Sequence, residues 1–206
     1  MANQRADFKD EMVGRRKLLL FVCIFNVKRS VIAEHFFRKR LVDSDAAVAS
    51  QIDVASAGFI GKEVSSWFQQ NNIPFPEPPF NRLTSKLICD HLFDRGINLS
   101  AHRSRPVTEA LLGQAHTVVP MLSILKRDLL WAYPHIKKKI VLPGEFLGEE
   151  KNFLWEDRSA VPNDQRMFEY AHNNLEYVTR VVDEIETFIQ DAFPKIVDHL
   201  LGADNE

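Results

Sequence analysis

The pattern of apolar and polar positions predicts strands that alternate with helices. Continuous apolar runs predict strands at residues 17–22, 52–57, 116–120 and 139–142. Apolar residues spaced three to four positions apart predict helices at 30–41, 83–95, 108–112, 122–131 and 166–192. Such alternation is typical of a parallel sheet, so we expect an α/β fold in which helices flank a four-stranded parallel sheet in three layers.

The same pattern divides the chain into three segments. Residues 1–16 are polar and predict a flexible N-terminal arm, and residues 17–192 form the α/β domain. Pro194 is expected to break the last helix, which leaves residues 193–206 as a C-terminal tail. The long helix 166–192 either covers the sheet, which we favour, or forms a coiled-coil seam.

Two further segments lack a clear period. Residues 65–81 contain four prolines and four aromatic residues, which predict an extended loop. This insert either folds back onto the domain or forms one wall of a binding cleft. Residues 145–164 are polar and are predicted to be irregular.

The amino-acid composition indicates which classes of partner and which cellular compartment are expected. The 206 residues include 26 basic and 28 acidic ones, a net charge of −2 that does not indicate a nucleic-acid or anionic membrane partner. Two cysteines are too few for a disulfide framework and indicate a reducing compartment, the cytoplasm. No segment approaches the ~20 apolar residues of a membrane span. The apolar run before Lys28 is too short for a signal peptide.

The candidate chemistry lies between the first strand and the helix after it. Its sequence is Cys23-Ile24-Phe25-Asn26-Val27-Lys28-Arg29-Ser30. Ligands of α/β folds bind at the carboxyl ends of the strands, which is where this loop is placed. The backbone amides of residues 24–29 and the following helix N-terminus can bind a phosphate dianion.

Two side chains complete this predicted phosphate site. Arg29 can bind two phosphate oxygens at once. The positive field of the loop favours the thiolate of Cys23, which is the nucleophilic form of the side chain. The alternative is a buried cysteine followed by a chance arginine. The position between a strand and a helix favours the functional interpretation.

Three stretches resemble the low-molecular-weight protein tyrosine phosphatase family. Residues 21–34, F-V-C-I-F-N-V-K-R-S-V-I-A-E, are similar to its signature V-C-x-G-N-x-x-R-S-x-x-A-E. Residues 54–58 resemble its S-A-G segment, and residues 96–105 resemble its G-I-x-x-x-x-H-x-A-R segment. The resemblance implies a cytoplasmic hydrolase of phosphotyrosine or a related phosphate monoester. Its partner would be a phosphorylated protein or a small phosphate ester, and no metal or cofactor is implied.

The resemblance also implies a role for each site residue. Cys23 would form a phosphocysteine, while Arg29 and the loop amides hold the equatorial oxygens. Ser30 would stabilise the thiolate as leaving group. Asn26, with Ser56 and His102, would support the loop by hydrogen bonds.

A general acid must protonate the leaving oxygen. In the family it is an aspartate in a late D-P segment, and the best match here is Asp157, with Glu156 and Asp164 as alternatives. Arg158 and Ser159 follow Asp157 in place of the usual proline and aromatic residue. Trp155 or the aromatic residues of the 65–81 insert would therefore have to supply the wall for a phosphotyrosine ring.

Three loop residues distinguish this chain from the family pattern. Phe25 stands where glycine is usual, and a bulky side chain there is expected to crowd the loop or require another backbone angle. Lys28 replaces a second cysteine and adds positive charge. Val27 is apolar, as in members that act on tyrosine, which favours an aryl phosphate over phosphoarginine.

Two other functions fit the same loop. A phosphatase-like module could bind phosphate or a phosphorylated partner without efficient turnover, as Phe25 and the altered D-P segment suggest. Arsenate reduction fits poorly, because that chemistry needs further cysteines and only Cys89 remains. The sequence does not indicate the oligomeric state.

Overall fold

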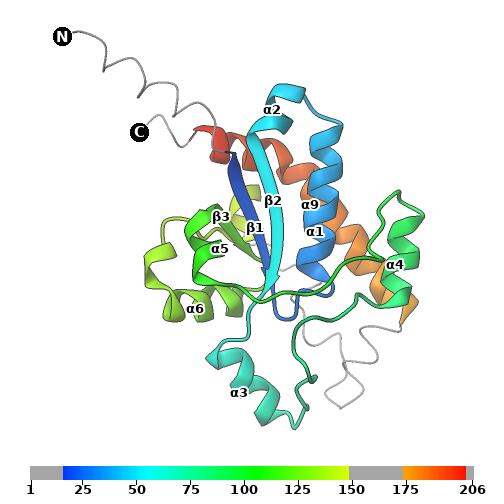
Figure 1. Cartoon of the computed structure of the whole chain (residues 1–206), viewed down its shortest axis with the longest axis vertical. Coiled ribbons are helices and arrows are strands. Elements are labelled where there is room, and N and C mark those ends of the chain that lie inside the picture. The colour runs from blue at the N-terminus through cyan, green and yellow to red at the C-terminus, as the bar shows by residue number, and fades with distance from the viewer. Residues whose placement is uncertain (1–15, 149–173, 203–206) are drawn as a thin grey trace, which may run out of the picture.

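The sheet of this protein consists of three parallel strands in the order β2-β1-β3 (Figure 1). The computed structural model describes residues 16–148 and 174–202. The strands are β1 (Lys17–Cys23), β2 (Ile52–Gly58) and β3 (Ala115–Pro120). The register pairs Cys23 with Gly58, and Val22 with both Ala57 and Pro120. All three strands therefore end at the same edge of the sheet.

The side chains of the central strand alternate between two apolar layers. Leu19 and Phe21 lie in the layer formed by α1 (Arg29–Val42) and α9 (Leu175–Gly202). Leu20 and Val22 lie in the layer that contains α5 (Glu109–Gln114) and the C-terminal part of α6 (Ser123–Ala132). Because strand side chains alternate with a period of two, one buried strand serves both layers. The three-layer α/β arrangement is confirmed.

Shorter helices surround this core. They are α2 (Ala46–Gln51), α3 (Lys62–Gln70), α4 (Lys86–Phe93), the 3₁₀ turn η1 (Pro134–Ile136) and α7 (Pro143–Leu147). The buried carboxylate of Asp128 in α6 accepts the backbone N–H groups of Glu63, at 2.9 Å, and Val64, at 3.0 Å. These bonds cap the N-terminus of α3 and fix it against α6. None of the helices in the described part of the chain is long and apolar enough to span a bilayer.

The sheet of the described residues has three strands and not the predicted four, because residues 139–142 pair with β3 only briefly. Only one parallel bridge forms there, between Val118 and Ile140. The N–H of Val118 donates to the carbonyl of Lys139 at 2.8 Å, and the N–H of Val141 donates to the carbonyl of Val118 at 3.0 Å. The extended chain ends at once, because Pro143 begins α7. Residues 145–147, which were predicted to be irregular, are helical because they belong to α7.

The 65–81 insert is only partly the extended loop that its prolines predict. Residues up to Gln70 belong to α3, whereas all four prolines lie after it. The amphipathic helix forms because Val64 and Phe68 bury one face. Residues 71–81 then run as irregular chain toward the edge where the strands end.

The prediction that Pro194 breaks the last helix is also wrong. Helix α9 continues through Pro194 to Gly202. A proline removes one backbone donor and kinks a helix, but it does not unfold residues that are held by packing. Phe193, Ile196 and Leu200 are all buried, so the burial of their side chains keeps the helix intact. Residues 193–202 are therefore part of the folded domain.

Candidate active site

The loop formed by residues 23–29, called here the Cys23 loop, lies at the edge where the strands end. It connects β1 to α1, so its residues begin at the buried end of a central strand and finish at a helix N-terminus. The carbonyl of Cys23 accepts the N–H of Phe59 at 2.8 Å, and the carbonyl of Val22 accepts the N–H of Met121 at 2.7 Å. The chain segments that leave β2 and β3 thereby hold the start of the loop.

The thiol of Cys23 is buried beside the first turn of α1. The hydroxyl of Ser30 donates a hydrogen bond to its Sγ atom at 3.0 Å. Cys23 is 3% exposed and Ser30 is fully buried. A hydroxyl donor at this distance stabilises a thiolate, because a charge-assisted hydrogen bond is stronger than a neutral one. The structure therefore places Ser30 where the resemblance implies that it acts.

The guanidinium of Arg29 lies on the same loop and has an unsatisfied donor. Its Nε atom is buried and has no hydrogen-bond partner in the part of the chain that the structure describes. A buried donor without an acceptor costs about 1–3 kcal/mol. An anion bound in the loop would supply that acceptor. The donor set therefore fits a tetrahedral oxyanion.

Asn26 holds the loop in its curved shape. Its φ of 54° is left-handed, which asparagine tolerates better than most residues. Its Nδ2 atom donates to the hydroxyls of Ser30, at 3.1 Å, and Ser56, at 2.8 Å. Its Oδ1 atom accepts the N–H of Arg105 at 3.1 Å, and its carbonyl lies 2.8 Å from Nε2 of His102. The structure thus brings Asn26, Ser30, Ser56 and His102 together in the Cys23 loop and around it.

Three more residues extend this support. Glu34 and Arg105 are the last residues of two of the family motifs, but the sequence analysis assigned a role to neither, and Arg38 lies outside the motifs. Ser56 donates to the carboxylate of Glu34 at 2.5 Å, and Arg38 donates to the same carboxylate at 2.9 Å. Arg105 donates from Nε to the carbonyl of Ser56 at 2.9 Å. Glu34 and Arg38 stand four positions apart on α1, a spacing that brings opposite charges together on a helix. That spacing was visible in the sequence.

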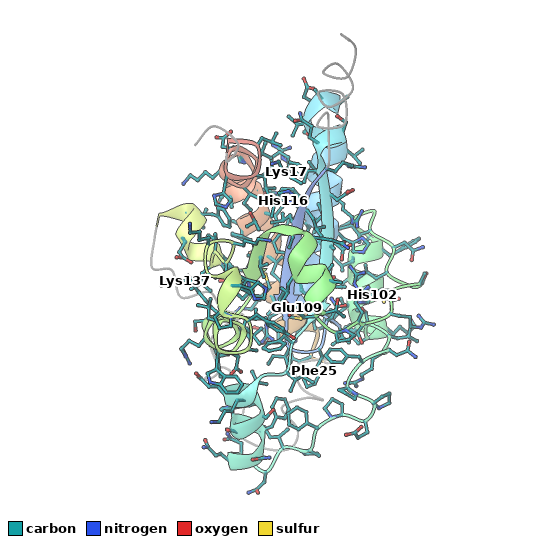
Figure 2. All side chains as sticks on the ribbon, turned by 60° about the vertical axis from the view of Figure 1, so that its left-hand side comes forward. Lys17, Phe25, His102, Glu109, His116 and Lys137 are labelled. Carbon is teal, nitrogen blue, oxygen red and sulfur yellow. The ribbon has the colours of Figure 1, made fainter. Side chains whose placement is uncertain are left out.

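Phe25 does not disturb the loop, contrary to the expectation from its size. Among described residues other than glycine, a positive φ occurs at Asn26, Asn72 and Asn81, and not at Phe25. Its side chain points from the loop toward α3 (Figure 2) and is 5% exposed. There the ring packs edge-on against Phe68, with centroids 5.7 Å apart. The position needs no glycine backbone, and the ring fills space in an aromatic cluster.

Lys28 is a buried cation inside the same loop. It is 6% exposed, and its Nζ atom lies 4.9 Å from the centroid of the Tyr177 ring of α9. The pKa of Lys28 is lowered from 10.5 to about 7, mainly by burial and also by the charge of Arg29, while the charge of Cys23 opposes both effects. An ammonium that titrates near neutrality is therefore part of the candidate site.

The remaining site residues of the sequence analysis lie outside the described residues. Asp157 and its alternatives Glu156 and Asp164 fall in the undescribed segment 149–173. Trp155, Arg158 and Ser159 fall there as well. In the described residues, no group of three or more His, Cys, Asp or Glu side chains is arranged to hold a metal ion.

Comparison with solved structures identifies the architecture. A low-molecular-weight protein tyrosine phosphatase from T. tengcongensis is 26% identical, with a TM-score of 0.62, and the match covers 87% of this chain and 99% of that one. A protein tyrosine phosphatase from Entamoeba histolytica is 20% identical, with a TM-score of 0.63, over 91% and 99%. The YwlE arginine phosphatase from Geobacillus stearothermophilus is 20% identical, with a TM-score of 0.61, over 91% and 95%.

This chain has the low-molecular-weight protein tyrosine phosphatase fold. No protein-family model and no curated protein matches the chain, so the likeness is one of structure. The match runs over 99%, 99% and 95% of the length of these three neighbours. Within this fold the neighbours include phosphatases of both tyrosine and arginine phosphate, as their names state.

Proposed function

We propose that this protein is a cysteine-dependent phosphatase that hydrolyses phosphate monoesters through a phosphocysteine intermediate. One observation carries the proposal: the buried thiol of Cys23 accepts a hydrogen bond from Ser30, on a loop whose Arg29 has a buried donor without an acceptor among the described residues. A nucleophile and an anion site on one loop are the two requirements of phosphoryl transfer to sulfur. The phosphatase neighbours support the same reaction.

The reaction would proceed in two steps. The Cys23 thiolate attacks phosphorus, a sulfur–phosphorus bond forms, and the bond to the leaving oxygen breaks as an acid protonates that oxygen. Water then attacks the phosphocysteine, inorganic phosphate leaves, and the thiolate returns. Arg29 and the loop amides hold the equatorial oxygens in both steps. Ser30 stabilises the thiolate as it departs in the second step.

We assign the general acid to Asp157, because in the sequence it is the best match to the family's late D-P segment and precedes the last helix at a similar distance. The same group would then act as a base toward water in the second step. Asp157→Asn should reduce kcat by about 10²–10⁴-fold, since general acid catalysis is typically worth that much. If Glu156→Gln or Asp164→Asn has that effect and Asp157→Asn does not, the assignment moves to that residue.

For the substrate we propose an aryl phosphate such as phosphotyrosine. Val27 is apolar and buried in the loop, and the aromatic residues Trp67, Phe68 and Phe75 lie on the insert that packs against Phe25. Because an arginine phosphatase shares the fold, phosphoarginine is the competing substrate. Comparing kcat/KM for a phosphotyrosine peptide and a phosphoarginine peptide decides between them.

The two alternative functions, a phosphate-binding module without turnover and an arsenate reductase, lose support. The backbone at Phe25 needs no positive φ, which removes one reason to expect a binding module without turnover. Arsenate reduction would need a second reactive thiol, but Cys89 lies on α4 and burial raises the pKa of its thiol. Both described cysteines are free, as a thiol nucleophile requires, and we propose a reducing compartment such as the cytoplasm.

The decisive experiment is hydrolysis of an aryl phosphate by three proteins. Wild type should release the aryl alcohol in an initial burst, followed by steady release of alcohol and phosphate, and Cys23→Ser should release neither while still binding phosphate. Cys89→Ser is the matched control, because it removes the other thiol outside the loop, and it should retain full activity. Turnover that persists in Cys23→Ser would refute the proposal.

A further inference from the structure

A chain of hydrogen bonds links the thiol of Cys23 to the carboxylate of Glu34 on α1. From the sulfur it passes through the hydroxyl of Ser30, the side-chain amide of Asn26 and the hydroxyl of Ser56. These three linking residues are buried, so water does not offer their side chains other partners. Each proton of the chain is therefore committed to one neighbour, and the number of protons on each group decides the direction of every bond.

The carboxylate of Glu34 sets this direction at one end of the chain. An ionised carboxylate only accepts hydrogen bonds, and here each oxygen accepts one. Oε1 accepts from Nε of Arg38 at 2.9 Å, and Oε2 accepts from the hydroxyl of Ser56 at 2.5 Å. A serine hydroxyl has a single proton. Because Ser56 donates that proton to Glu34, its oxygen acts as an acceptor toward Nδ2 of Asn26, which lies 2.8 Å away.

The amide of Asn26 passes this direction on. Its Oδ1 atom accepts the N–H of Arg105 at 3.1 Å, so both protons of Nδ2 remain for the hydroxyls of Ser56 and Ser30. A reversed amide would turn its oxygen toward Ser56, and two acceptors would then face each other, because the proton of Ser56 is already donated to Glu34. Glu34 and the N–H of Arg105 thus hold the amide in the same orientation from two sides.

The orientation of this amide decides where the hydroxyl of Ser30 donates. Because Ser30 accepts a hydrogen bond from Asn26 at 3.1 Å, its own proton remains for the sulfur of Cys23, 3.0 Å away. A second acceptor, the carbonyl of Ala57, lies farther away, at 3.5 Å. With the amide reversed, its oxygen would compete with the sulfur for the same proton. The observed orientation keeps the donor on the sulfur.

We propose that Glu34 is a positioning residue of the phosphatase reaction, whose carboxylate directs the hydroxyl of Ser30 toward the thiolate of Cys23. This role rests on the proposed function. It matters most in the second step, in which the thiolate leaves phosphorus and a charge-assisted hydrogen bond stabilises it. Three side chains separate Glu34 from the sulfur, so its effect passes through Ser30.

Glu34→Gln is the informative substitution, because it keeps the size of the side chain and replaces one acceptor by a donor. The amide of glutamine can accept from Ser56 or from Arg38, but not from both. Stopped-flow kinetics with an aryl phosphate should show phosphocysteine hydrolysis about tenfold slower and the first step much less affected. The inhibition constant of inorganic phosphate should stay within about twofold, since the loop amides and Arg29 are unchanged.

A double-mutant cycle with Ser30→Ala separates this role from a merely structural one. If Glu34 acts through Ser30, Glu34→Gln should slow phosphocysteine hydrolysis about tenfold in the wild type and less than about twofold in the Ser30→Ala protein. A structural role would change the rate by the same factor in both proteins. The same is true of a direct effect of the Glu34 charge on the sulfur.

Two further variants complete the design. Arg38→Met is the matched control, because it removes the cation beside Glu34 and leaves both carboxylate oxygens. Ser56 then continues to donate, and phosphocysteine hydrolysis should stay within about twofold of wild type. Ser56→Ala breaks the chain one bond nearer the sulfur and should show the same dependence on Ser30. It provides a second cycle if thermal unfolding shows that Glu34→Gln is not folded.

The outcomes are distinct. Slowing by Glu34→Gln that disappears in the Ser30→Ala protein supports the role of Glu34. Equal slowing with and without Ser30→Ala, or no slowing in either protein, would overturn it while the phosphatase reaction stands. A wild-type protein that does not hydrolyse the aryl phosphate would contradict the proposed function itself, and the role of Glu34 would fall with it.

Discussion

The ring of Phe25 meets the ring of Phe68 edge to face, with their centroids 5.7 Å apart. Phe75 stacks on Phe68 at 4.5 Å and also contacts Phe25, with centroids 6.3 Å apart. A residue of the Cys23 loop is therefore anchored to α3 and to the chain after it. The side chain that replaces the usual glycine ties the insert to the loop.

Phe68→Ala should weaken this anchor. Phe68 is 1% exposed, and removal of a buried phenylalanine ring costs about 3–5 kcal/mol of the free energy of unfolding. Because Phe25 loses its partner, kcat/KM for an aryl phosphate should fall as well. Phe93→Ala, at a ring that is 66% exposed, is the control and should change stability by less than about 0.5 kcal/mol. Full activity in a destabilised Phe68→Ala protein would show that the loop does not depend on α3.

Asn26 combines a left-handed backbone with several hydrogen bonds, and two substitutions separate these contributions. Asn26→Gly retains the backbone freedom and loses the side-chain bonds, whereas Asn26→Ala loses both. Urea unfolding should show Asn26→Ala to be less stable than Asn26→Gly by about 1–2 kcal/mol. Both should lose aryl phosphate activity, because Ser30 and Ser56 lose a shared donor. Equal stability of the two variants would mean that the backbone at this position is relaxed.

The fold was largely predictable because its signals are local. The apolar run in β1 and the three-to-four spacing in α1 each reflect a buried face, and burial decides secondary structure more than any other factor. The prediction of a full fourth strand did not hold, because sheet pairing is not local. Ile140 is apolar, but Pro143 ends the extended chain after a single bridge. The predicted helix end at Pro194 was wrong because the packing of α9 overrides the low helix propensity of proline.

The candidate site was predictable in part for the same reason. Cys23, Asn26, Arg29 and Ser30 lie within eight residues, so a short motif contains them. The contact of Phe25 with Phe68 joins positions 43 apart, and the contact of Lys28 with Tyr177 joins positions 149 apart. Contacts between residues so far apart in the sequence leave no periodic hydrophobic pattern from which they could be predicted. The side chains that distinguish this site from the phosphatase pattern that it resembles could therefore be interpreted only with the fold in view.

Ser30→Ala should slow the second chemical step more than the first. The Ser30 hydroxyl lies 3.0 Å from the Cys23 sulfur, and in the proposed mechanism it would stabilise the thiolate that leaves phosphorus. A hydrogen bond to a charged group contributes about 1.5–3 kcal/mol, which corresponds to roughly 10- to 150-fold in the rate of phosphocysteine hydrolysis. Stopped-flow kinetics should therefore show a larger burst followed by slower turnover. Ser50→Ala, at an exposed serine whose hydroxyl donates to the carbonyl of Ala47, should leave both phases unchanged.

Lys28 should make stability depend on pH. The pKa of Lys28 is lowered by burial from 10.5 in the unfolded chain to about 7 in the folded one. Between these values the unfolded chain binds more protons, so the free energy of unfolding should rise with pH, by at most about 1.4 kcal/mol per unit. Urea unfolding in buffers free of phosphate and sulfate, at about pH 7.5 and about pH 9, should show wild type gaining up to about 2 kcal/mol more than Lys28→Met. An equal rise in the free energy of unfolding of both proteins would contradict this prediction, because it would mean that the Lys28 ammonium remains hydrated in the folded protein.

Gly58→Ala tests whether the end of β2 must approach the Cys23 loop without a side chain. A Cβ atom there would lie 2.5 Å from the Phe80 ring, 2.8 Å from the carbonyl oxygen of Ile24 and 2.9 Å from the carbonyl carbon of Phe25. A ring can turn aside, but the two backbone atoms belong to the loop and can move only with it. We expect a loss of about 1–3 kcal/mol in stability and a larger loss in aryl phosphate turnover.

A second glycine shows whether the effect is specific to that contact. Gly113 lies in α5, where an added Cβ meets nothing within 4 Å. Gly113→Ala should raise stability by about 0.5–1 kcal/mol, because alanine is the better helix former, and it should leave turnover unchanged. If Gly58→Ala keeps wild-type turnover, the loop tolerates displacement. The close approach of β2 would then serve packing alone and not the geometry of the anion site.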